Sequence, residues 1–344
     1  MRLRKVRVDA PGIVRKRRGR GFAYVDAKGR PVRDPEILDR IRALAIPPAW
    51  TDVWVCPEAN GHVQAVGTDA AGRRQYRYHD AWRARRDALK FDRMIAFART
   101  LPTVRARVAE DLGDEEITRE KALATAVRLL DQGFFRVGSE AYTKQNGSFG
   151  LATLRKDHVS VNGDVAVFDF TAKSGKRRVQ EIADPDVLEP VREMLARRSG
   201  GRELLAYRDG TRWKDVRSAD INEYLRDATG GEFTAKDFRT WHGTVLAAVF
   251  LATRDEERTS VTSTRRAIGG AIKDVASYLG NTPAIARSSY VDPRVIERFE
   301  QGVTIAPTLQ RLRTDDPTDP VFREAVEAAV LDLLEEADAG AKAA

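Results

Sequence analysis

Five polar side chains between positions 136 and 290 have the types that phosphoryl transfer requires: Arg136, Lys173, Arg239, Asn281 and Tyr290. Attack on a phosphodiester builds negative charge on two non-bridging oxygens, and two guanidiniums supply rigid donors for both. A lysine can protonate the departing alkoxide, and an amide can donate a further hydrogen bond without adding charge. A phenol, with a pKa of about 10, is a better leaving group than a sugar hydroxyl, so a phosphotyrosine formed in one step can be undone in the next.

These side chains fall at the ends of predicted elements. Alternating residues with turn signals at Asn162-Gly163 and Ser174-Gly175 predict a three-stranded antiparallel sheet within residues 158–182, with Lys173 at its second turn. Helical periodicity is found at residues 118–130, 186–198, 218–228, 236–254 and 263–279. The site is therefore expected where helices and a hairpin end together.

The segment LGNTPAIARSSYV, residues 279–291, ends one helix and begins another. Thr282 and Pro283 predict an N-cap and a first-turn proline. Two turns along the new helix, Tyr290 can face the basic cluster. The alternative is a half-buried ring with no role in chemistry, and the presence of Arg136, Lys173 and Arg239 favours the functional interpretation.

The first 89 residues differ from the rest of the chain. Short alternating runs separated by Gly and Asn-Gly predict a small antiparallel sheet. A helix is predicted at residues 34–44, and it ends before the paired prolines of IPPAW because they cannot continue it. A charged amphipathic helix follows at residues 82–101. We predict a β-rich N-terminal domain (1–89), a larger, mainly helical domain (90–312) and an acidic C-terminal helix or tail (313–344), which packs on the domain or binds a partner.

Composition narrows the class of protein. The 344 residues carry a net charge of +8, and residues 1–20 hold nine Arg or Lys against one Asp, which favours a polyanionic partner. The single cysteine, Cys56, indicates a reducing compartment. The four histidines are widely dispersed, which argues against a zinc site and against a Ser-His-Asp triad. No apolar run reaches the roughly 18 residues of a membrane span, so we expect a soluble, intracellular protein.

The combined motifs resemble the type IB DNA topoisomerases of the short, poxvirus-like and bacterial kind. The blocks that carry the resemblance are IPPAW, QYRYH, FFRVGSEAY, GLATLRKDHV, KDFRTWHGT, LGNTP and SSY. The resemblance implies an α+β fold, in which a β-rich domain and a helical catalytic domain close around DNA. It also implies a nicking, swivelling and resealing enzyme that needs neither ATP nor metal, acts on double-stranded DNA as a monomer and is cytoplasmic and nucleoid-associated.

Residue roles follow from the same resemblance. Tyr290 resembles the nucleophile that becomes linked to a DNA 3′-phosphate, Arg136 and Arg239 the two arginines on the scissile phosphate, and Lys173 the general acid for the 5′-oxygen. Asn281 stands where viral and recombinase relatives usually have histidine, so we expect the same role with less dependence on pH.

Further residues are predicted to contact DNA. Tyr76 and Tyr78 alternate onto one face of a strand beside Arg73 and Arg74, which suits phosphates and base edges; covering the sheet's own core is the alternative for either tyrosine. Backbone or groove contacts are predicted for Tyr142, Lys144 and Lys236.

Two other functions share some of these features. A tyrosine site-specific recombinase uses the same dispersed Arg, Lys, Arg and Tyr, but usually carries H-x-x-R where this chain has Lys236 and Arg239, and usually begins with a helical domain. A non-catalytic basic DNA-binding protein would use the charged surface alone. Plasmid relaxation in EDTA separates these functions from a topoisomerase.

Overall fold

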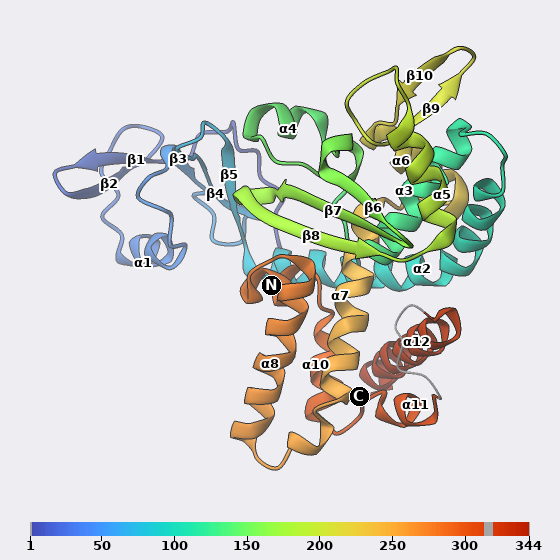
Figure 1. Cartoon of the computed structure of the whole chain (residues 1–344). Helices are drawn as coiled ribbons and strands as arrows, with labels where there is room; N and C mark the ends of the chain where they lie inside the picture. The colour runs from blue at the N-terminus through green and yellow to red at the C-terminus, as the bar shows by residue number, and fades with distance from the viewer. Residues whose placement is uncertain (1, 313–318, 344) are drawn as a thin grey trace. The chain divides into compact units, whose positions relative to one another are not determined.

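The computed structural model describes residues 2–312 and 319–343, and the chain divides into two compact units, residues 1–92 and 93–344 (Figure 1). The first unit is built on a five-stranded antiparallel sheet in the order β2-β1-β3-β4-β5. Its elements are β1 (Ile13–Arg18), β2 (Gly21–Val25), α1 (Pro35–Ala43), β3 (Thr51–Val55), β4 (Val63–Thr68) and β5 (Arg74–Tyr78).

Apolar residues on one side of this sheet pack against α1. Its core contains Ile13, Ile41, Val53, Val55 and Ala65. The Asp34 carboxylate caps α1 by accepting from the Glu36 N–H, and the helix ends before the paired prolines, as predicted. In the basic N-terminal run, Arg15 is buried and donates to the carbonyl oxygens of Pro47 and Trp50, so this arginine is structural.

The second unit is mainly helical. The long helix α2 (Asp80–Leu112) enters it from the first unit. The elements that follow are α3 (Arg119–Gly133), α4 (Glu140–Asn146), β6 (Val159–Asn162), β7 (Val165–Ala172), β8 (Lys176–Ile182), α5 (Pro185–Ala196), β9 (Ala206–Asp209), β10 (Arg212–Asp215), α6 (Ser218–Thr229), α7 (Ala235–Ala252), α8 (Val261–Leu279), α9 (Pro283–Ser289), α10 (Pro293–Glu300), α11 (Ala306–Arg311) and α12 (Pro320–Ala343). Short 3₁₀ turns lie at residues 151–153, 156–158, 173–175 and 255–257.

The structure corrects some predicted elements. The helix predicted to end at residue 101 continues through Pro102 to Leu112. Its apolar side stays buried beyond the proline, through Val104, Val108 and Leu112, and this packing outweighs one lost backbone hydrogen bond. The β9-β10 hairpin and the short helix α4 were not predicted, because neither has a long enough hydrophobic repeat.

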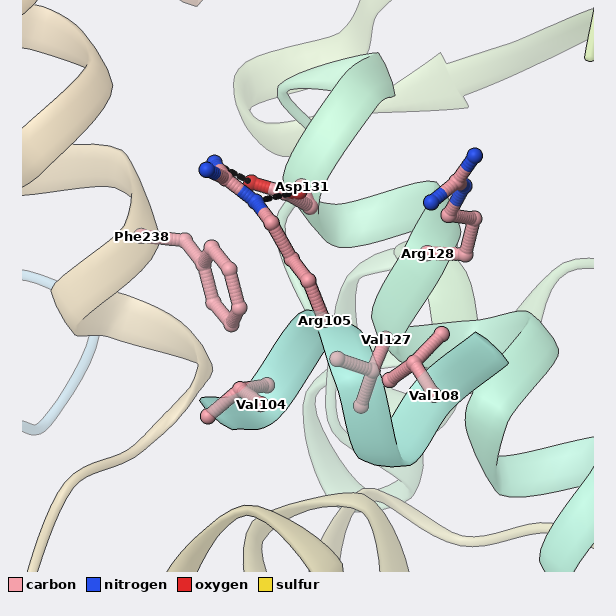
Figure 2. A pocket seen from close by; sticks show the side chains of 7 residues that line it. All are labelled: Val104, Arg105, Val108, Val127, Arg128, Asp131 and Phe238. Carbon is pink, nitrogen blue, oxygen red and sulfur yellow. Dashed lines mark hydrogen bonds and ion pairs between the residues drawn. The ribbon is translucent and has the colours of Figure 1, made fainter. Parts of the chain in front are cut away.

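The acidic helix α12 packs on the second unit through buried ion pairs. Asp131 of α3 accepts two hydrogen bonds from Arg105 of α2, as Figure 2 shows, and also pairs with Arg323 of α12 at 3.1 Å. Arg105 in turn binds Glu327 of α12, with Nη1 2.7 Å from Oε2. The Arg105–Asp131 pair borders a small cavity lined also by Val104, Val108, Val127, Arg128 and Phe238. The described part of α12 is thus held by charges in the domain interior.

The predicted fold class is confirmed: an N-terminal antiparallel sheet precedes a mainly helical unit with a small three-stranded sheet, β6-β7-β8. The domain limits at residues 89 and 312 stay predictions, as does closure of the two parts around DNA; residues 313–318 lie outside the described part of the chain. Among the described helices, none combines the length and hydropathy that a membrane crossing requires.

Candidate active site

Arg136 and Asn281 form one half of the cluster. Arg136 follows the left-handed C-cap of α3, Phe134 (φ 52°), and its Nη2 donates to the Asn281 Oδ1 at 2.5 Å. Because the Asn281 oxygen accepts this bond, its Nδ2 is left as a donor, and that nitrogen is buried without a partner among the described residues. An acceptor such as a phosphate oxygen would satisfy it.

The turn that carries Asn281 has a glycine at its centre. Gly280 ends α8 at φ +61°, and the Asn281 N–H donates to the Ala276 carbonyl at 2.8 Å in the manner of a Schellman cap. Thr282 then caps α9, whose first residue is Pro283. The predicted break and restart are therefore confirmed.

Arg239 forms the other half of the cluster from the first turns of α7. Asp237 caps this helix by accepting from the Thr234 N–H at 2.8 Å, which places Arg239 on the inner side with only 4% of its surface exposed. The guanidinium donates to two carbonyls at helix ends, that of Phe134 after α3 at 2.6 Å and that of Leu279 in α8 at 2.7 Å. It therefore joins the two loops that carry Arg136 and Asn281.

Tyr290 is the C-cap of α9 and is half-buried. The Arg239 guanidinium carbon lies 5.2 Å from the centre of its ring. Its backbone packs on α7, where a Cβ on Gly243 would lie 2.7 Å from the Tyr290 carbonyl oxygen. The Thr244 hydroxyl lies 3.2 Å from the same oxygen and accepts from the Asp292 N–H at 3.1 Å. Two neighbouring residues of α7 thus fix the backbone of the tyrosine.

The electrostatics of the cluster suit an anion. Burial lowers the pKa of Arg239 to about 10, and the positive charge of Arg136 acts in the same direction while Tyr290 opposes it. Burial also lowers the pKa of Arg136, with Tyr290 and Tyr142 opposing. Neither guanidinium has a carboxylate ion-pair partner within the described residues. Two close cations, Arg239 buried and Arg136 half-buried, are costly without a counter-ion, and a phosphate would offset that cost.

The structure places Lys173 differently from the other four candidates. It lies exposed in the turn between β7 and β8, next to Ser174 in the left-handed region (φ 68°). Four of the five candidates therefore converge in this structure, while Lys173 stands at the end of a hairpin. Its role as general acid stays a prediction that requires the hairpin turn to reach the phosphate.

The predicted DNA contacts are distributed over both units. In the first unit the rings of Tyr76 and Tyr78 stack with centroids 5.9 Å apart on β5; Arg74 is exposed, and Arg73 pairs with Asp69 at 3.0 Å. In the second unit Tyr142 and Lys144 lie on α4, and Lys236 is exposed in the first turn of α7. Their contacts with DNA stay predictions.

Comparisons with known proteins bear on this constellation. A family model for the catalytic core of eukaryotic DNA topoisomerase I matches residues 79–314, which is more than half of the chain. The chain belongs to the type IB DNA topoisomerase family. A second model, for the N-terminal domain of bacterial DNA topoisomerase IB, matches residues 21–69 of this topoisomerase. The resemblance inferred from the sequence motifs is confirmed.

Individual relatives of the topoisomerase extend the match over most of its length. It is 30% identical over 319 residues to DNA topoisomerase 1B of Acanthamoeba polyphaga mimivirus, covering 91% of this chain and 94% of the relative. The identity to DNA topoisomerase 1B of vaccinia virus (strain Western Reserve) is 23% over 266 residues, or 76% and 81% of the two chains. DNA topoisomerase 1 of Drosophila melanogaster matches at 25% over 164 residues, only 16% of its own length.

Sequence reasoning missed three residues that hold this topoisomerase's cluster together. Arg178 of β8 is half-buried beside Gly280, but in the run KSGKRR it looks like a solvated charge. Gly243 and Thr244 lie within the block KDFRTWHGT, four and five residues after Arg239. One helical turn separates positions four apart, so the spacing from Arg239 is the signal that could have identified Gly243.

Proposed function

We propose that Tyr290, Arg136, Arg239 and Asn281, joined by Lys173, form the active centre with which this type IB topoisomerase relaxes supercoiled duplex DNA. The observation that carries the proposal is the convergence of the first four side chains around the Gly280 turn. These residues come from three separate stretches of the chain, at positions 136, 239 and 281–290. Family membership supports the reaction class, and this geometry supports the assignment of the four residues.

The reaction is a reversible transesterification. The Tyr290 hydroxyl oxygen attacks the phosphorus and gives up its proton to solvent water, and the bond from phosphorus to the 5′-oxygen breaks. The 5′-oxygen takes a proton from Lys173, which leaves a 3′-phosphotyrosine and a free 5′-hydroxyl. One phosphodiester replaces another, so the bond's energy is retained; after the free end rotates, the 5′-hydroxyl attacks the phosphotyrosine and restores the strand.

The side chains around the phosphorus have separate roles in that step. Arg136 and Arg239 donate to the two non-bridging oxygens, where negative charge builds up in the transition state. Asn281 uses its Oδ1 to orient Arg136 and its Nδ2 to donate to the same phosphate. Because an amide does not titrate, this donor keeps its state across the pH range of the reaction.

The basic N-terminal run (residues 1–20) and the stacked Tyr76–Tyr78 pair would add contacts to duplex DNA. We place the enzyme, as a monomer, on the cytoplasmic DNA of a bacterium, consistent with the match of the bacterial N-terminal model.

Plasmid relaxation tests the proposal. The purified protein should convert supercoiled plasmid to relaxed topoisomers in EDTA without added nucleotide. Tyr290→Phe should abolish relaxation while retaining DNA affinity, because only a hydroxyl is lost. Relaxation by the variant would refute the role of Tyr290, and recombination products or mere retardation of the plasmid would refute the function.

A further inference from the structure

Arg178 is a third guanidinium at the edge of the cluster. It lies on β8, and burial lowers the pKa of its side chain to about 10, with the positive charge of Arg136 adding to the effect. Its charge also contributes to lowering the pKa of Arg239. Like the other two, it has no carboxylate ion-pair partner within the described residues. Placing a third, half-buried cation without a counter-ion beside two others costs stability, which a role in function would explain.

The hydrogen bonds of Arg178 reach the ends of the two helices, α3 and α8, that precede Arg136 and Asn281. Its Nη2 donates to the Tyr278 carbonyl at 2.7 Å, three residues before Asn281. Its Nε donates to the Gln180 Oε1 at 2.5 Å, and the Gln180 amide donates to the Gly133 carbonyl, three residues before Arg136. Arg178 and Gln180 therefore tie the end of α8 to the end of α3 through one strand.

Gly280 allows this arrangement. A Cβ on Gly280 would lie 2.7 Å from the Arg178 Nη1 and 3.9 Å from the Arg136 Nη1. The glycine also has φ +61°, which other residues adopt at a cost. The turn is thus shaped for two guanidiniums to approach it from one side.

We infer that Arg178, acting with Gln180, is a positioning residue that holds the Arg136–Asn281 pair in the geometry needed for strand cleavage. The inference rests on the proposed function of that pair. Arg178 acts through the carbonyl of Tyr278 and the amide of Gln180, so its loss misplaces the donors to the phosphate and leaves the nucleophile in place. The strand β8 begins just after the turn that holds Lys173, so the same element supports both the acid and the donors.

Single-turnover cleavage tests this inference. A duplex that traps the covalent adduct would be mixed with excess enzyme, and the rate of adduct formation measured at saturating protein. Arg178→Ala should slow cleavage by about a hundredfold, as expected for donors displaced by about 1 Å, and change DNA affinity by less than about threefold. Arg178→Lys keeps the positive charge but loses the planar guanidinium that donates to two partners at once. Its cleavage rate should therefore lie between those of Arg178→Ala and the wild type.

Arg177→Ala is the matched control. Arg177 is the same residue type on the same strand, is exposed, and pairs with Asp169 at the surface. Its removal should leave the cleavage rate within about twofold of wild type, as expected for a surface pair. An equal loss in the Arg177 and Arg178 variants would overturn the inference, because it would indicate a general effect of surface charge.

A double-mutant cycle separates positioning from direct contact with DNA. If Arg178 works through the Arg136–Asn281 pair, Arg178→Ala should cost less than about threefold in an Asn281→Ala background. Full additivity, or a wild-type rate for Arg178→Ala alone, would overturn the inference. If the wild-type enzyme forms no adduct on Tyr290, the proposed function fails; if it does and Arg178→Ala is unimpaired, the inference alone fails.

Discussion

Gly243→Ala puts the packing of the proposed nucleophile, Tyr290, to a direct test. Gly243 lies within α7, where alanine is favoured over glycine by about 1 kcal/mol on helix propensity alone. In this protein the added Cβ would lie 2.7 Å from the Tyr290 carbonyl oxygen, 2.9 Å from the Tyr290 Cβ and 3.2 Å from the Leu279 Cδ1. Ordinary contact begins at 3.4 Å, so the shortfall at the carbonyl is about 0.7 Å.

The backbone of Tyr290 has to move, because α7 is held in place by the packing of its buried side chains. The neighbours Trp241 and Thr244 are completely buried, and the closest atom to the new methyl group belongs to the backbone of Tyr290. Overpacking costs about 1–3 kcal/mol, so after the gain in propensity the variant should be destabilised by about 0–2 kcal/mol. If Tyr290 is the nucleophile, as proposed, its shift by about 0.7 Å should slow cleavage by roughly 10- to 100-fold.

The assay pairs single-turnover cleavage with urea unfolding. Gly269→Ala is the matched control: this glycine lies within α8, and a Cβ there would meet no atom within 4 Å. We expect the control to gain about 0.5–1 kcal/mol of stability and to keep the wild-type rate. If Gly243→Ala behaved like Gly269→Ala in both measurements, the inferred contact between α7 and Tyr290 would be refuted.

Three further changes are expected to have distinct effects. Arg239→Ala should slow single-turnover cleavage by at least about a hundredfold, because one transition-state donor is lost; a near-normal rate would count against its role. Lys173→Ala should be slow on ordinary DNA but close to wild type on a duplex whose scissile 5′-oxygen is replaced by sulfur, a leaving group that needs no acid; equal impairment on both substrates would show that Lys173 is not the acid. Burial would raise the pKa of Asp131, but Arg105 and the His242 hydrogen bond hold it well below its usual range, so its contribution to stability is present above about pH 4 and is lost as the pH falls further. Asp131→Asn should therefore lose about 3–5 kcal/mol of unfolding free energy at pH 7 and less at pH 3, whereas an equal loss at both pH values would contradict the ionised pair.

Local signals in the sequence sufficed for most elements and for part of the site. Thr282-Pro283 marked the start of α9, and Asn162-Gly163 marked the first turn of the small sheet, because caps and tight turns depend on adjacent residues. Residue types and the family resemblance identified Arg136, Arg239, Asn281 and Tyr290, which the structure brings together.

The remaining features depend on contacts between distant segments. Arg177 and Arg178 are neighbours of identical type, yet one is exposed and the other reaches the Tyr278 carbonyl a hundred positions away. No local pattern distinguishes them except the alternation of strand faces. Likewise, the continuation of α2 through Pro102 depends on the core on which it packs, and the exposed position of Lys173 depends on the hairpin's direction in space.

Identification of the amino acid that becomes linked to DNA tests the account most directly. The enzyme would be trapped on a duplex with a single cleavage site, digested with protease and examined by mass spectrometry. The account predicts one modified peptide, with a nucleotide joined through its 3′-phosphate to Tyr290. Attachment to any other residue, or to a 5′-phosphate, would contradict it.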